Sequence, residues 1–162
     1  MSASQLQQLE ITWETEINKG NSFYQSSVFT EANTHYMNAM MASELLLGNI
    51  VTTSKYLFKL PSMYFIACIN IANTFWAMKD INNASSYFLY CTYKMKKLTD
   101  QPGINGLLKE AASEYWLKAV QFYSQFSQIT GTPILPNLDK EETYFQLQKM
   151  KNLFSLGKEN MN

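Results

Sequence analysis

The stretch Gly20-Asn21-Ser22-Phe23-Tyr24 decides the fold, because it occurs a second time as Ala72-Asn73-Thr74-Phe75-Trp76. An alanine follows each copy at the same distance, as Ala32 in the first and Ala84 in the second. The spacing continues with Tyr36 and Ala39 after the first copy, and with Phe88 and Cys91 after the second. The two copies are 52 residues apart, and a pattern kept over such a span indicates a repeated structural unit.

The small residues of this pattern predict a helical hairpin. Two helices joined by a tight turn can approach closely only where neither presents a large side chain, which explains Gly20 opposite Ala32 and Ala72 opposite Ala84. Large aromatic residues next to these sites would fill the space where the helices diverge. Such a hairpin cannot bury its hydrophobic face alone, so we expect the copies to stack on each other.

Apolar residues recur at helical spacing along nearly the whole chain, which predicts an all-α fold of about six helices in three antiparallel hairpins. The expected helices span residues 4–26, 29–48, 61–78, 84–97, 107–129 and 139–157. Gly48 is expected to end the second helix, and Pro61 suits the first turn of the third. Residues 49–60 fit either an irregular linker or a helical extension.

One domain is expected over residues 1–157, with hairpins at about 4–48, 61–98 and 104–156 and a frayed tail at 158–162. The third hairpin lacks the repeated signature, so it is either a diverged repeat or a terminal cap. Cys68 and Cys91 fall at similar levels of the second hairpin, and we expect two buried, unreactive thiols.

Charge and composition argue against several classes of function. The chain has 13 basic and 13 acidic residues, and all the basic ones are Lys. With no net field and no Arg for bidentate phosphate contacts, we expect no nucleic-acid binding. The N-terminal residues lack the pattern of a secretory signal, and no apolar run is long enough to span a bilayer. We therefore expect a cytoplasmic protein without a membrane partner.

No motif in the sequence predicts catalysis. Glycine-rich phosphate loops and nucleophile signatures supported by a histidine are absent, so we expect no enzyme activity and no cofactor. Glu31 and His35 lie one helical turn apart and could share a metal ion. Two ligands do not complete a site, so a solvated helix face is the expected explanation and no metal site is predicted.

The first copy with Tyr36 and Ala39, and less closely the second, resembles the tetratricopeptide repeat (TPR). Two copies are recognisable, and the third hairpin would be a diverged one. The sequence departs from the family at the early Trp and Leu positions, where Glu16 and Lys19 stand in the first copy. The offset of 52 residues also exceeds the period of about 34 of a regular array. The resemblance implies a right-handed superhelical stack with a concave groove.

In that family the groove is lined by the first helix of each hairpin and binds peptides. The matching positions here are Ile17, Asn21, Tyr24, Ile69, Asn73 and Trp76. The resemblance implies a protein-binding module, an adaptor or a chaperone-like protein that holds a partner peptide or helix. Ile17 and Ile69 stand where some relatives carry a Lys, which disfavours a clamp for a terminal carboxylate. The alternative is a structural or assembly protein whose hairpins self-associate, for example as a homodimer.

Overall fold

The computed structural model describes residues 1–49 and 58–133, and these residues form five helices and no strand. The helices are α1 (Ala3–Gln25), α2 (Phe29–Leu47), α3 (Leu60–Ala77), α4 (Ile81–Asp100) and α5 (Gly106–Thr130). The prediction of an all-α fold is therefore confirmed. The final predicted helix at 139–157, the tail, and most of the segment at 49–60 lie outside the described residues.

The predicted helix boundaries are right except at α4. Gly48 follows the last residue of α2, and Pro61 lies in the first turn of α3, as predicted. The start of α4 was predicted at Ala84, but the helix begins at Ile81. The reason is the side chain of Asp80, which accepts a hydrogen bond of 3.1 Å from the backbone N–H of Asn83 and so caps the helix.

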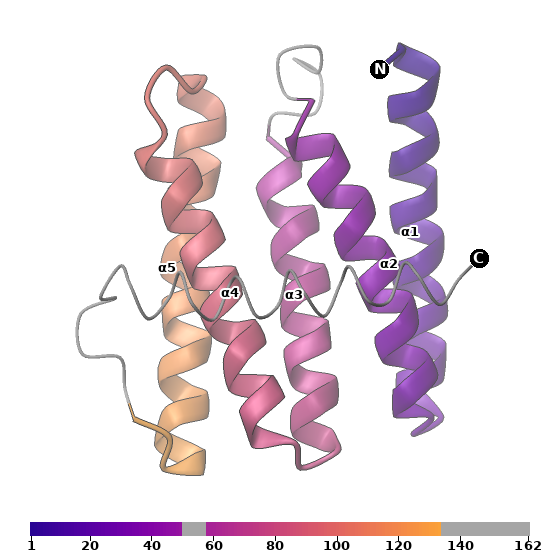
Figure 1. Cartoon of the computed structure of the whole chain (residues 1–162), viewed down its shortest axis with the longest axis vertical. Coiled ribbons are helices and arrows are strands. Elements are labelled where there is room, and N and C mark those ends of the chain that lie inside the picture. The colour runs from indigo at the N-terminus through magenta and orange to yellow at the C-terminus, as the bar shows by residue number, and fades with distance from the viewer. Residues whose placement is uncertain (50–57, 134–162) are drawn as a thin grey trace.

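Consecutive helices run antiparallel and lie side by side, with α2 and α4 nearer the viewer than α1, α3 and α5 in Figure 1. Each helix packs against the next one in the chain, and α3 also contacts α5 and, more lightly, α1. The turns α1–α2 and α3–α4 lie at one end of the stack, and the connection between α4 and α5 lies at the opposite end (Figure 1). The first, third and fifth helices therefore form one layer.

The two turns at the lower end of the stack have the same hydrogen bonds. The N–H of Val28 donates to the carbonyl of Phe23 over 2.9 Å, and the N–H of Asp80 donates to that of Phe75 over 2.9 Å. This bond belongs to the Schellman motif, in which one residue adopts a left-handed conformation. That residue is Ser27, with a φ of 60°, in the first turn and Lys79, with a φ of 61°, in the second. The backbone conformation of the first turn thus recurs 52 residues later, at the same offset as the sequence pattern.

Structural features of α3 recur in α5 at the same offset of 52 residues, although the sequence signature does not recur there. Gly131, which is 52 residues after Lys79, ends α5 with a φ of 72°. The indole of Trp13 donates to the carbonyl of Met63 over 3.1 Å, and residues at the corresponding positions, Phe65 and Tyr115, have ring centroids 5.1 Å apart. The first pair joins α1 to α3, and the second joins α3 to α5 at the corresponding positions. The helices α1, α3 and α5 therefore share one register.

The close approach predicted from small residues is confirmed. Ala32, Ala72 and Ala84 are fully buried. A Cβ atom at Gly20 would lie 2.5 Å from Cε1 of Tyr36, which is closer than two carbon atoms can pack. The ring of Tyr36 therefore occupies the space that the missing side chain of Gly20 leaves.

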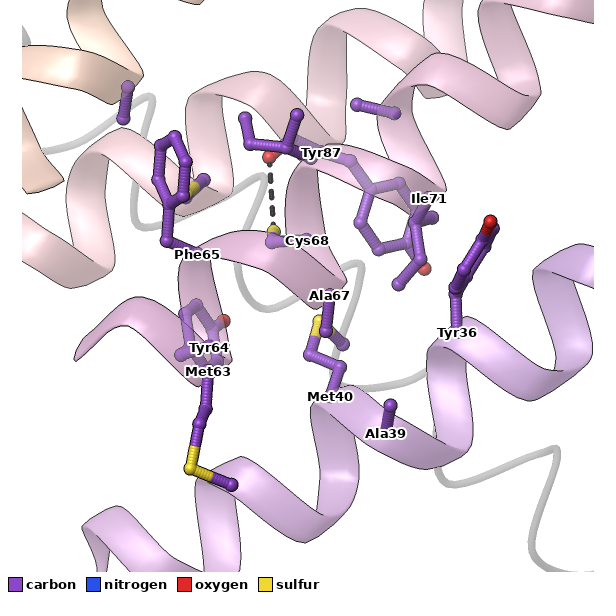
Figure 2. Close-up of a cluster of buried hydrophobic side chains, with 14 of the residues drawn as sticks. Tyr36, Ala39, Met40, Met63, Tyr64, Phe65, Ala67, Cys68, Ile71 and Tyr87 are labelled. Atoms are coloured by element: carbon purple, nitrogen blue, oxygen red, sulfur yellow. Dashed lines mark hydrogen bonds between the residues drawn. The ribbon is translucent and has the colours of Figure 1, made fainter. Parts of the chain in front are cut away.

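The core is continuous from α1 to α5, and its central part lies around α3 (Figure 2). Tyr64 and Ile71 of α3 are fully buried there together with Met40 of α2. The thiol of Cys68 donates to the carbonyl of Tyr87 over 3.4 Å, as the dashed line in Figure 2 shows. Cys68 and Cys91 are both fully buried, as predicted. Burial, followed by the neighbouring Cys91 thiol, raises the pKa of Cys68 well above its ordinary value.

Candidate partner-binding face

One layer of the stack presents three parallel rows of solvent-accessible side chains, which we call the α1/α3/α5 face. Each row contains four residues spaced four, three and four apart, a spacing that keeps side chains on one side of a helix. Corresponding positions differ by 52 residues, so the rows share one register. The rows are Glu14, Asn18, Asn21 and Gln25 on α1, Ile66, Asn70, Asn73 and Ala77 on α3, and Lys118, Phe122, Gln125 and Ile129 on α5.

Ile17 and Ile69, two of the six residues predicted for the groove, lie in the hydrophobic core with 8% and 5% of their surface exposed. Both side chains pack against neighbouring helices, so little of their surface is accessible to a ligand. The two isoleucines thus belong to the core below the face. The prediction that they anchor a ligand has no support from their burial.

The other four predicted residues lie on the face or at its edge. Asn21 is exposed, and its side-chain oxygen accepts a hydrogen bond of 2.8 Å from the hydroxyl of Tyr36. Tyr24 is 36% exposed and packs edge-on against Phe29. Asn73 and Trp76 are both half-buried. These residues are positioned for contact with a ligand, but their role in binding stays a prediction.

Two further asparagines lie on the face beside Asn21 and Asn73. Asn18 and Asn70 are separated by the same 52 residues and lie one turn before Asn21 and Asn73. Within residues 1–49 and 58–133, the side chains of Asn18, Asn70 and Asn73 form no hydrogen bond. Asn18 and Asn70 were not predicted, although the motif Asn-x-x-Asn, present in both copies, was a signal for them.

The face carries little charge. Of its twelve residues only Glu14 and Lys118 are ionisable. The Lys118 ammonium lies 2.6 Å from Glu114 and 4.6 Å from the centre of the Tyr115 ring, whereas Glu14 has no ion pair with any described residue. A face of this kind lacks the unpaired cation that would attract an acidic ligand.

A polar cluster on the other side of α1 corrects the expectation for His35. Its Nδ1 donates to Glu16 over 2.8 Å, and its ring is stacked on Phe23 at 5.3 Å. His35 is therefore held between the helices of the first hairpin and does not lie on a solvated face. Burial disfavours the charged form of Glu16, but hydrogen bonds from His35 and Asn38 outweigh it, so the pKa of this carboxyl lies below its ordinary value.

This cluster predicts a pH-dependent stability. Because the pKa of Glu16 is lowered in the folded state, its contribution is present above the unfolded value of 4.5 and is lost as the pH falls through the folded one. We expect Glu16→Gln to lower the free energy of unfolding by about 1–2 kcal/mol at neutral pH. The difference from wild type should shrink as the pH falls below 4.5.

Urea unfolding at several pH values measures this effect. Glu14→Gln is the matched control, since Glu14 is exposed and has no ion pair among the described residues. Its difference from wild type should be small at every pH. Parallel stability curves for wild type and Glu16→Gln over this pH range would show that the ionised Glu16 carboxylate does not stabilise the hairpin.

A second polar cluster joins α2, α3 and α4 in the core. Glu44 accepts hydrogen bonds from the hydroxyl of Tyr90 over 2.8 Å and from the ammonium of Lys94 over 3.1 Å. Burial, as the largest cause, raises the pKa of Tyr64 and of Tyr90 well above the ordinary value. Both phenols therefore stay neutral, and neither is suited to act as a general base. The contacts of this cluster are those of a structural link between α2 and α4.

Comparison with known proteins adds no relative: no family model, no curated protein and no solved structure matches the chain. The resemblance to the TPR family thus rests on the residues quoted above and stays an interpretation. Among the described helices, none is both long enough and apolar enough to cross a membrane.

Proposed function

We propose that this protein is a non-enzymatic interaction module that binds an extended segment of a partner protein on its α1/α3/α5 face. The observation that supports the proposal is the set of Asn18, Asn21, Asn70 and Asn73. Three of these four side chains form no hydrogen bond with the described part of the chain, although all four lie in register on neighbouring helices.

Free amide groups fit the backbone of an extended peptide. Each Asn side chain offers two N–H donors and one oxygen acceptor, which matches the alternating N–H and C=O groups of a peptide in extended conformation. A helical ligand has already satisfied its backbone groups internally and would leave these amides unused. An extended segment is therefore the form of partner that the face suits best.

The proposal can be tested with a phage-displayed library of random peptides, selected on the full-length protein. Selected peptides are synthesised with a fluorescent label, and their affinity is measured by anisotropy. We expect the double variant Asn70→Ala, Asn73→Ala to bind them at least about fivefold more weakly, because each lost hydrogen bond contributes about 0.5–1.5 kcal/mol. Circular dichroism confirms that the variant is folded.

A matched control carries Asn82→Ala and Gln101→Ala, two exposed amides on α4 and just after it. This variant should bind like wild type. Equal affinity of wild type and of the Asn70, Asn73 variant would reject binding through the amides. A stable homodimer in light scattering, dissociated by the Asn70, Asn73 substitutions, would instead favour self-association through the same face.

A further inference from the structure

We infer that the α5 end of the face is a subsite for an apolar side chain of the partner segment, formed by Trp76, Phe122 and Ile129. This inference rests on the proposed function and specifies the chemistry of its ligand. The three side chains are large and apolar, and 39% of Phe122 and 69% of Ile129 are exposed to solvent. Burial of such surface by a ligand would be favourable at about 25 cal/mol per Å².

The three residues lie around Phe126 of α5. Trp76 packs edge-to-face on Phe126, with ring centroids 5.3 Å apart, and this contact joins α3 to α5. Phe122 lies one helical turn before Phe126 and packs edge-on against Phe65 of α3 at 5.8 Å. Ile129 lies one turn after Phe126, next to the last residue of α5. Phe126 is 1% exposed, so it supports the subsite from the core.

The corresponding positions on the other two helices are not large and apolar. Phe122 is in register with Asn18 and Asn70, and Ile129 is in register with Gln25 and Ala77. The α1 row thus has no large apolar side chain, whereas Phe122 and Ile129 alternate with Lys118 and Gln125 on α5. A segment laid across the three helices would meet mainly hydrogen-bonding groups at one end and exposed apolar side chains at the other, so the face distinguishes the two directions of the ligand.

The dimensions of the stack set the spacing of the ligand. Packed helices lie about 10 Å apart, and an extended chain advances about 3.3 Å per residue, so neighbouring rows are about three residues apart. The apolar residue of the ligand should therefore stand about three residues from the part that contacts Asn73 and about six from the part that contacts Asn21. Glu14 on α1, which has no ion pair within residues 1–49 and 58–133, further disfavours acidic residues at the amide end.

The library selection described above tests the inference. We expect the selected peptides to share one large aliphatic or aromatic residue, with uncharged polar residues about three to six positions away on one side only. The double variant Phe122→Ser, Ile129→Ser should bind these peptides at least about tenfold more weakly. Replacing the apolar residue of the peptide with Ala should weaken binding to wild type, but have little further effect on the double variant.

The control variant is Met41→Ser with Leu45→Ser, which removes two exposed apolar side chains from α2 and should leave the affinity unchanged. Selected peptides without a shared apolar residue, or equal binding by the Phe122, Ile129 variant, would overturn the inference. If the Asn70, Asn73 variant still loses binding in that case, the proposed function survives without the subsite. If neither variant loses binding, or if no peptide is selected, both proposals fail.

Discussion

Replacing Phe126 with Ala is expected to lower the free energy of unfolding by about 3–5 kcal/mol. Phe126 is 1% exposed, and its ring contacts those of Trp76 at 5.3 Å, Phe88 at 5.0 Å and Tyr123 at 6.3 Å. Its ring thus contacts both α3 and α4. Its truncation would leave a cavity that the three rigid aromatic neighbours cannot fill, so the cost includes lost burial as well as empty space.

Urea denaturation followed by circular dichroism measures this loss as a lower midpoint. Leu117→Ala is the control on the same helix, because Leu117 is 62% exposed and its truncation should cost less than about 0.5 kcal/mol. A loss below about 1 kcal/mol for Phe126→Ala would mean that α5 does not pack on α3 and α4 through this ring.

Replacing Gly20 with Ala should also destabilise the protein, by about 1–2 kcal/mol. In an exposed helix this substitution is stabilising by about 1 kcal/mol. Here the new methyl group would lie 2.5 Å and 2.6 Å from two ring carbons of Tyr36. Tyr36 is 3% exposed and its hydroxyl is bound to Asn21, so the ring cannot swing away. The strain of such overpacking, about 1–3 kcal/mol, exceeds the gain in helix propensity.

Gly106→Ala provides the comparison, since a Cβ atom at Gly106 would meet no atom within 4 Å. The two variants make the same chemical change in a helix, and only the one at Gly20 should lower the urea midpoint. If Gly20→Ala proved as stable as wild type, the two helices of the first hairpin would have to lie farther apart than described.

The repeated signature was sufficient to predict the helical hairpins, because small residues at a fixed spacing reflect a packing constraint within each unit. It did not reveal α5 as a third helix in the same register. Ser127 stands there in place of Phe23 and Phe75, and Ser124 in place of Gly20 and Ala72. The register is preserved instead by interhelical contacts and by the turn at Gly131, which a comparison of side chains does not detect.

The position of a site residue could be predicted only where it depends on the spacing within a single helix. Helical spacing was enough to place Asn21 and Asn73 on one side of their helices, but it did not show that Ile17 and Ile69 are covered by neighbouring elements. The partner of His35 could not be predicted either, because Glu16 lies on another helix and Glu31 and Glu44 are closer to His35 in sequence. Contacts between helices depend on rotation and offset, which sequence periodicity does not determine.

The order of the helices has a consequence for how the chain folds and opens. Most contacts join helices that are adjacent in sequence, so the contact order is low and rapid folding is favoured. Stability in such a linear stack is close to a sum over neighbouring interfaces, and it is lowest where a helix has one principal neighbour. In α1, which relies mainly on α2, backbone amides would exchange their hydrogens before those of the central α3. The amide-rich row of the face thus lies on a helix that can detach without unfolding the rest.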